Sequence, residues 1–406
     1  MTCEITQGMI FLVLLRSCFG ACLVDAVTRL LSDLVAIPSV NPMGRAVSGP
    51  EYYEDRLTDY LENFFQIRGL KSRRDLILPG RENLLAHYHA PGSRRTILFD
   101  VHQDTVPVEG MTIDPFGAKI DSGRLYGRGA CDVKGSMAAM LLAFERLCAE
   151  KPRGSASVIL ALTVDEEFTH IGSSRLAEMK PEVDLAIVAE PTKLDLVTTH
   201  KGAIRWKIVT RGIACHSSTP NLGDNAIYRM AKVISALQDH ADELARSQVD
   251  PMLGSASLSV GRIEGGQSVN VVPDRCEIEI DRRVIPGEDP DRTIARVAEF
   301  LQARLGTLDD LEFLPAWVKM PALRANMNPI DLDMMSKIIA KKIGREPRRV
   351  GVPYGTDAGP LGQVGVPCVV FGPGDIAQAH TKDEWVDLDE VRTAAELYFD
   401  LAVGLG

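Results

Sequence analysis

Residues 97–136 decide how the rest of the chain is read. They begin Ile-Leu-Phe-Asp-Val-His-Gln-Asp and end Gly-Arg-Gly-Ala-Cys-Asp-Val-Lys-Gly-Ser. The apolar run at 97–101 predicts a buried strand. His102 and Asp104 follow that run at a spacing of two, so an extended chain points both side chains to one face. Asp132 stands in the glycine-rich turn at the other end. A histidine and two carboxylates displayed in this way are suitable ligands for a divalent metal.

Other apolar runs along the chain also lead into polar residues. Residues 157–163 form a β-type run ahead of three consecutive acids at 165–167, and residues 184–189 form another ahead of Glu190. His380 follows a fourth run. Three adjacent acids repel one another, which indicates a nearby cation or strong donor. Open α/β sheets place their sites at the carboxyl ends of parallel strands, so we expect these side chains to gather there.

Five short motifs occur in a fixed order along the chain. They are His102-x-Asp104, Gly127-Arg-Gly-x-x-Asp132-x-Lys-Gly, Asp165-Glu166-Glu167, Glu190-Pro-Thr and Ala379-His380. Each motif alone is weak, but the five in this order are specific. Together they resemble the two-zinc aminoacylase/carboxypeptidase family of metallohydrolases, the M20-type peptidases. That family includes acetylornithine deacetylase, succinyl-diaminopimelate desuccinylase and the glutamate carboxypeptidases. The resemblance covers residues 26–400, nearly the whole chain.

The resemblance implies a centre with two divalent metal ions. One metal would be bound by His102 and Glu190, the other by Glu167 and His380, and Asp132 would bridge both. Imidazole and carboxylate ligands suit zinc, our first choice, and also cobalt or manganese. Two cations roughly 3.5–4 Å apart would offset the crowded acids and hold a hydroxide between them. For any one of these residues alone a structural role is the better explanation; the complete set favours the metal centre.

The resemblance also assigns two acids beside the metals. Glu166 matches the general base, which takes a proton from the metal-bound water and returns it to the leaving amine. Asp104 matches the acid that orients His102 and fixes its tautomer, with a turn cap as the alternative.

Five further residues match substrate-binding positions of the family. His216 resembles the histidine that stabilises the developing oxyanion, and in relatives this histidine can enter the partner subunit's site. Asn270 and Arg283 resemble the residues that bind the substrate carboxylate, a task that suits arginine because it pairs in a bidentate manner. A surface role for Arg283 stays open because another arginine precedes it. Gly355 and Thr356 resemble a loop that lines the acyl or carboxylate pocket.

The order of expected elements predicts an α/β protein with a mainly parallel sheet flanked by helices. In residues 26–202 and 316–406 strands alternate with helices, such as the apolar segment 137–147. Residues 203–315 instead read as a small α+β domain inserted into the larger one. By resemblance this insert acts as a lid and as the dimer surface. Residues 1–25 form an N-terminal extension that we expect to be poorly ordered; a signal peptide and a wrongly assigned start codon stay open as alternatives.

Composition narrows the class of protein. The formal net charge of −10 disfavours attraction to nucleic acid. The eight cysteines are scattered without a Cys-x-x-Cys pair, which favours free thiols in a reducing cytoplasm. No run reaches the roughly 18–20 apolar residues of a membrane span. We therefore expect a cytoplasmic homodimer whose partner is a small substrate, with neither nucleic acid nor membrane involved.

The predicted reaction is the removal of an N-acyl group from a small amino acid by a metal-bridged water, with Glu166 as general base. The pattern around His380 is most similar to acetylornithine deacetylase. The desuccinylase fits less well, because Ala358 stands where that enzyme usually has glycine. A carboxypeptidase or dipeptidase with the same metals is the second enzyme hypothesis. A catalytically dead binding relative is the alternative outside enzymes, which the complete ligand set with Glu166 disfavours.

Overall fold

A computed structural model describes residues 26–406 in two units. The extension predicted for residues 1–25 lies outside the described residues. The first unit contains the described residues up to Leu196 together with Met327–Arg349 and Val366–Gly406, and the second contains Val197–Asn326 and Val350–Gly365. The predicted insert, 203–315, lies within the longer segment of the second unit.

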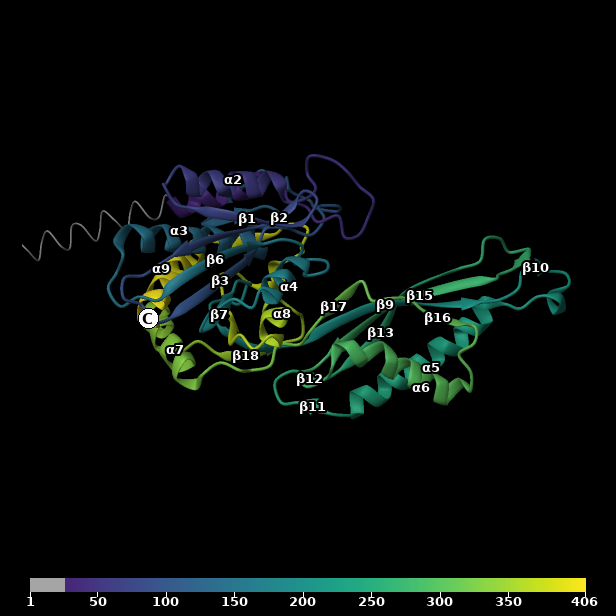
Figure 1. Ribbon diagram of the computed structural model, residues 1–406. Coiled ribbons are helices and arrows are strands. Elements are labelled where there is room, and N and C mark those ends of the chain that lie inside the picture. Colours follow the sequence, from purple (N-terminus) through teal and green to yellow (C-terminus); the bar gives the residue numbers. More distant parts are fainter. Residues whose placement is uncertain (1–25) are drawn as a thin grey trace, which may run out of the picture. The chain divides into compact units, whose positions relative to one another are not determined.

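The first unit is built on a mixed sheet whose strands follow the order β1-β2-β6-β3-β7-β19 (Figure 1). These strands are β1 (Ser72–Leu78), β2 (Arg81–Tyr88), β6 (Ser157–Thr163), β3 (Thr96–His102), β7 (Leu185–Val188) and β19 (Cys368–Val370). The pairs β1–β2 and β2–β6 are antiparallel, whereas β6, β3, β7 and β19 are mutually parallel. The prediction of an α/β protein with a mainly parallel sheet is confirmed.

Helices cover this sheet. They are a first helix at residues 26–36, α2 (Asp55–Gln66), α3 (Gly135–Glu150), α4 (Ile171–Glu178), α7 (Pro329–Ile343) and α9 (Leu388–Gly404). The amphipathic α2 buries Leu57, Leu61 and Phe65 and lies over β1 and β2 (Figure 1). A small separate sheet joins the short strands β4 (Lys119–Asp121), β5 (Arg124–Tyr126) and β20 (Trp385–Asp387).

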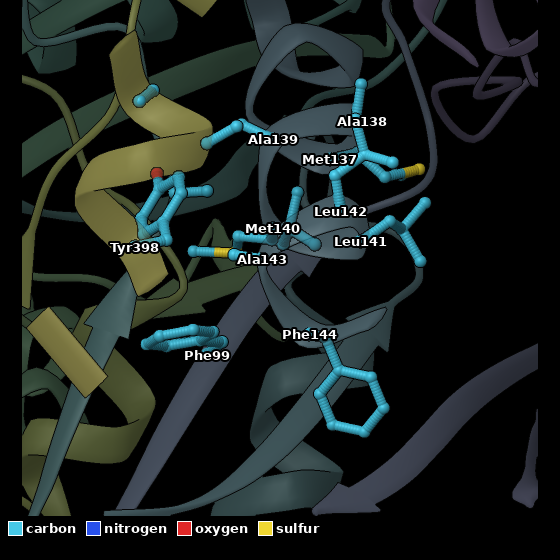
Figure 2. Packing of buried hydrophobic residues seen from close by; sticks show 14 of the residues in the cluster. Phe99, Met137, Ala138, Ala139, Met140, Leu141, Leu142, Ala143, Phe144 and Tyr398 are labelled. Carbon is cyan, nitrogen blue, oxygen red and sulfur yellow. The ribbon is translucent and has the colours of Figure 1, made fainter. Parts of the chain in front are cut away.

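The core of the first unit centres on α3, which is apolar on nearly every side. Its residues from Gly135 to Phe144 are all buried, because α9 and the sheet cover it. Figure 2 shows Phe99 of β3 and Tyr398 of α9 beside Met140 and Ala143 of α3. The rings of Phe99 and Tyr398 lie 5.6 Å apart. Each large apolar side chain buried in this way contributes about 1.5–3 kcal/mol to folding. The core thus fixes the sheet and α3, the two elements that flank the predicted site.

The second unit has its own sheet and its own core. Its strands are β13 (Ser257–Gly265), β15 (Arg275–Val284), β9 (Gly202–Arg211) and β16 (Leu311–Phe313), in that order, with β17 (Val318–Met320) also paired to β9. Helices α5 (Ala226–Arg246) and α6 (Thr293–Leu305) lie along this sheet (Figure 1). Asn225 caps α5 by accepting hydrogen bonds from the first turn. Buried residues of α5, α6 and the sheet form one apolar cluster.

Short elements complete the second unit. They are β10 (Cys215–His216), β11 (Val249–Asp250), β12 (Gly254–Ser255), β14 (Val271–Val272) and α8 (Ala358–Gln363). Strands β8 (Leu196–His200) and β18 (Arg349–Val352) each begin at the last residue of a first-unit segment and continue into the second unit. Within residues 26–406, none of the helices is both long and apolar enough to span a membrane.

Candidate active site

The predicted metal ligands of the first unit follow its parallel strands. His102 is the last residue of β3, the acids at 166–167 follow β6, Glu190 follows β7, and His380 lies beyond β19. Pairing of β3 with β6 places His102 opposite the last residue of β6. Asp132 lies in the segment η1 (Ala130–Lys134) directly before α3. The carboxyl ends of parallel strands share one edge of a sheet, which is why residues far apart in sequence can meet here.

Asp132 lies between the two histidines. Its Oδ1 is 3.2 Å from Nε2 of His102, and its Oδ2 is 3.3 Å from Nε2 of His380. The same Nε2 of His380 is 3.1 Å from Oε2 of Glu167. Each oxygen of the Asp132 carboxylate therefore faces a different imidazole nitrogen.

These side chains fit a divalent cation. Donor atoms about 2.0–2.1 Å from a tetrahedral cation lie about 3.3 Å from one another, close to the observed separations. Ligand atoms of His102, Asp132 and Glu167 lie within 4.8 Å of one another, and so do those of His102, Glu166 and Glu190. Oε1 of Glu167 is buried, and no hydrogen-bond partner for it exists among residues 26–406. A buried carboxylate oxygen of this kind is costly unless a cation binds it.

The electrostatics of the cluster lead to the same conclusion. Burial opposes ionisation of Asp132, but hydrogen bonds from His102 and His380 lower its pKa below the usual range. Burial lowers the pKa of His380, yet Asp132 and Glu167 raise it to about 11. Burial and the charge of Asp132 raise the pKa of Glu167. Burial also opposes a proton on His102, but the neighbouring acids raise its pKa, so they favour positive charge on both histidines. A divalent cation would supply that positive charge instead and release protons.

The turn that carries Glu166 and Glu167 is held by Asp104. The Asp104 carboxylate accepts the main-chain N–H groups of Glu166 and Glu167, each at 3.1 Å, and the side-chain amide of Asn41 at 2.7 Å. Nδ1 of His102 is 3.0 Å from the main-chain oxygen of Asp104 but 3.7 Å from its carboxylate. The main chain of Asp104 thus faces the imidazole, while its carboxylate positions the two acids.

Comparison with known proteins identifies the family. The sequence model of peptidase family M20/M25/M40 matches residues 98–403. The chain belongs to this family. It is 32% identical over 343 residues to acetylornithine deacetylase of Myxococcus xanthus, which covers 82% of this chain and 88% of that protein. It is 27% identical over 361 residues to succinyl-diaminopimelate desuccinylase of Corynebacterium glutamicum, a match that covers 86% of this chain and 92% of that protein. The resemblance inferred from the motifs is confirmed, and the chain is a hydrolytic enzyme of a family that acts on amide bonds.

Solved structures of the M20 family share the fold. A metallo-carboxypeptidase of this family from Sulfolobus solfataricus superposes with a TM-score of 0.75 at 20% identity, covering 92% of this chain and 98% of that one. A dinuclear metal-binding peptidase of the family from Bacillus subtilis superposes with a TM-score of 0.67 at 18% identity, covering 94% of this chain and 98% of that one.

Sequence reasoning missed an ion cluster next to the acidic turn of this M20 enzyme. Arg81 is buried and donates from Nε to Oε2 of Glu54 at 2.8 Å and from Nη1 to Oδ1 of Asp165 at 2.6 Å. Asn41 also donates to Asp165 at 2.8 Å. Burial raises the pKa of Glu54 to about 7, although Arg81 opposes this. The run of acids at 165–167 was the only sign of such a counter-charge in the sequence.

In the second unit of the M20 enzyme, His216 and Asn270 lie together, whereas Arg283 lies apart from them. Strand β10 pairs with β14, and the main-chain N–H of Ser217 donates to the main-chain oxygen of Asn270 at 3.0 Å, so His216 and Asn270 are neighbours. Strand β15 begins at Arg275, five residues after Asn270. Arg283 lies eight residues further along this strand, about 27 Å away at roughly 3.4 Å per residue. It pairs with Asp281 at 2.7 Å.

Gly355 and Thr356 are shaped by packing in the second unit. A Cβ atom at Gly355 would collide with the side chain of Met320, so only glycine fits there without a shift. Thr356 is buried, and its Oγ1 accepts the main-chain N–H of Ala358 at 3.2 Å, at the start of α8.

Proposed function

We propose that this M20 enzyme is a metal-dependent deacylase that removes an N-acyl group from a small amino acid. The observation that carries the proposal is the position of Asp132, whose two oxygens face His102 at 3.2 Å and His380 at 3.3 Å. A ligand that bridges two cations requires this geometry. His102 and Glu190 would then hold one cation, and Glu167 and His380 the other.

The proposed chemistry divides between the cations and Glu166. Bound divalent ions, zinc first with cobalt or manganese as alternatives, would polarise the substrate carbonyl and make water more acidic. Glu166 takes the proton of the attacking water as it adds to the carbonyl carbon, and returns it to the amine as the C–N bond breaks. Asp104 supports this role because it holds the main chain of Glu166 in place.

The relatives favour one substrate class. Acetylornithine deacetylase of Myxococcus xanthus, at 32% identity, supports an N-acetyl amino acid; the desuccinylase of Corynebacterium glutamicum, at 27%, keeps a larger acyl group as the second candidate. Cleavage of dipeptides is the third.

A substrate panel tests the proposal. The purified protein is loaded with zinc or cobalt, its metal content is measured, and it is offered N-acetylornithine, N-succinyl-diaminopimelate, other N-acyl amino acids and dipeptides. We expect two metals per chain, fastest hydrolysis of an N-acyl amino acid, and loss of activity with a chelator. Fewer than one metal per active chain would exclude the two-metal centre, and cleavage of dipeptides alone would make the enzyme a peptidase.

We also propose a homodimer formed through the second unit. His216 and Asn270 lie at the end of β15 opposite Arg283, so one chain cannot present all three to one small substrate. A second copy could supply the missing pair. Apolar side chains near His216 and Asn270 support an interface, because Tyr228 is 72% exposed and Val269 is 98% exposed.

A reducing compartment such as the cytoplasm suits the thiols. Within residues 26–406 the free cysteines are Cys131, Cys148, Cys215, Cys276 and Cys368.

A further inference from the structure

A buried glutamate outside the five motifs, to which the sequence analysis gave no role, contacts the segment that carries Asp132. Glu384 has no exposed surface. Its Oε1 accepts the main-chain N–H groups of Cys131 at 2.9 Å and of Asp132 itself at 3.0 Å. Its Oε2 accepts the main-chain N–H of Gly129 at 3.1 Å and Nη1 of Arg128 at 2.6 Å. One carboxylate therefore receives four donors from four nearly consecutive residues.

The backbone around Asp132 explains why such an acceptor is required. Asp132 has φ −120° and ψ 89°, and Val133 has φ −136° and ψ 20°, both outside the helical region. Gly129, Cys131 and Asp132 precede α3, so a regular helix offers their N–H groups no acceptor. Glu384 supplies that acceptor. A buried N–H without a partner costs about 1–3 kcal/mol, so three of them would favour a different backbone path.

Glu384 also links two of the candidate ligands. It follows His380 by four residues, and its main-chain oxygen accepts the N–H of Gly127 at 3.0 Å. Directly after it, β20 pairs with β5, with Trp385 opposite Tyr126. The segment that leaves His380 is thus attached, through both the side chain and the main chain of Glu384, to the segment that carries Asp132.

We propose that Glu384 is a positioning residue for the metal centre: it sets the main chain of Asp132 so that both carboxylate oxygens face the two metal positions. This inference rests on the proposed function, because it requires Asp132 to be a ligand. Glu384 itself lies behind Asp132 and receives main-chain donors, so it acts through Asp132.

The four donors require a carboxylate rather than a group of the same shape. A glutamine at this position has one acceptor oxygen and an NH₂ group that only donates. In Glu384→Gln, the NH₂ group would face either the N–H groups of Cys131 and Asp132 or those of Gly129 and Arg128. Glu384→Asp keeps the charge but is one methylene shorter, so it can reach only part of the donors.

A matched control tests whether Glu384 only stabilises the fold. Asp331, also buried, accepts both Nη atoms of Arg95 at 2.8 Å. Arg95 precedes the first residue of β3, whereas His102 is its last residue, so this ion pair lies at the end of the strand away from the site. Asp331→Asn therefore weakens a partly buried, charge-assisted contact of the same unit without touching the candidate ligands.

The test is a titration with Co²⁺, followed by its visible absorption, at one pH and well below the unfolding temperature. We expect Glu384→Gln to weaken cobalt binding by about 10–100-fold and to change the absorption spectrum, as changes behind metal ligands typically do. Glu384→Asp should lie between Glu384→Gln and the unchanged protein. Asp331→Asn should lower the melting temperature and leave cobalt affinity and spectrum unchanged.

Two results would overturn the inference about Glu384 and leave the proposed function standing. One is a Glu384→Gln protein that binds two Co²⁺ ions with unchanged affinity and spectrum; the other is an equal loss of affinity in Asp331→Asn. If Glu384→Gln does not fold, Glu384→Asp decides, and unchanged binding by that variant rejects the role. If the unchanged protein binds no cobalt, the proposed function fails and this inference fails with it, so the two failures are distinguishable.

Discussion

Glu166 and Glu167 share one turn but face different neighbours. Oε2 of Glu167 is 3.1 Å from His380, whereas ligand atoms of Glu166 lie within 4.8 Å of those of His102 and Glu190. Asp104 accepts the main-chain N–H of both acids, so each is held by the same anchor. Adjacent residues on a tight turn can thus serve two purposes, one as a ligand and the other as a base.

If Glu166 is the base and Glu167 a metal ligand, substitution of Glu166 should lower turnover, whereas substitution of Glu167 should lower metal content. Glu166→Gln should keep both metals and an unchanged KM, while kcat falls by about 10²–10⁴-fold, because proton transfer occurs only on the way to the transition state. Glu167→Ala should lose a metal, and part of its activity should return with excess zinc. Metal content and steady-state kinetics of both variants provide the measurement. Metal loss in Glu166→Gln but not in Glu167→Ala would show that the two assignments are reversed.

At this scale the sequence predicts residues that belong to short motifs and misses those that do not. His102 and Asp104 follow an apolar run at a readable spacing. Glu384 contacts the main chain of Asp132 across 252 positions, and Arg81 meets Asp165 across 84. Nothing local marks such a contact, because it depends on how separate elements pack. For the Asp104 carboxylate the sequence left a turn cap open, but it did not indicate which turn, since the N–H groups that it accepts belong to the turn after β6.

Among the elements, a buried acid attaches the segment after β7 to the end of α7. Asp195 accepts Nη1 of Arg345 at 2.6 Å, Nε of Arg348 at 2.7 Å and the main-chain N–H of Arg348 at 3.0 Å. Arg345 also donates to the main-chain oxygen of Lys193 at 2.7 Å. These contacts fix the chain that leads away from Glu190.

Asp195→Asn should destabilise the metal-free protein, by about 1–3 kcal/mol near pH 7, because it removes charge-assisted hydrogen bonds. Burial opposes ionisation, but Arg345 and Arg348 lower the pKa of Asp195 below its ordinary 3.8. Because the pKa of Asp195 is lower in the folded protein than in the unfolded one, the ionised carboxylate stabilises the fold at any pH above the unfolded-state pKa. This stabilisation is lost as the pH falls through the folded-state pKa. Urea unfolding should therefore show a gap between the two proteins that closes below pH 3.8. A gap that stays constant or widens in acid would contradict this account.

Long elements were predictable and short ones were not. The run at 157–163 coincides with β6, the run at 97–101 lies within β3, and the apolar segment 137–147 lies within α3. Their apolar content makes them visible in the sequence. The strands of the β4-β5-β20 sheet have three residues each, too few for a period to show. They are strands only because residues distant in sequence pair with them.

At the scale of the whole molecule, the chain interleaves its two units. The second unit contains Val350–Gly365 as well as its long segment, and this piece carries Gly355 and Thr356. Composition does not separate it from its neighbours, because it reads like the α/β segments on either side. The division into units depends on contacts that local patterns do not record.

The proposed dimer predicts complementation between inactive variants. His216→Ala and Glu166→Gln should each be nearly inactive as homodimers. If His216 serves the partner's site, a heterodimer has one site with both residues intact, so random mixing should restore activity to about one quarter of the sites. Activity after mixing and light scattering at micromolar concentration provide the measurements.

The control is a second mixture, in which the Glu166→Gln protein is mixed with the Glu167→Ala protein. Both changes lie in the first unit, so every site of that heterodimer lacks one of the two acids, and mixing without excess zinc should restore no activity. Recovery in this control, or a monomer by light scattering, would contradict the shared site.

The late position of His380 and α9 has a consequence for biosynthesis. Strand β19 pairs with β7, and α9 packs on α3, yet both are synthesised after the long segment of the second unit. A nascent chain that already contains His102, Asp132 and Glu167 therefore lacks the second histidine and the helix that covers its core. Domains tend to fold in order of emergence from the ribosome, but this first unit must wait for α9. The enzyme should thus gain metal and activity only after α9 has been synthesised, and a chain stalled before α9 should be a client for chaperones rather than an active hydrolase.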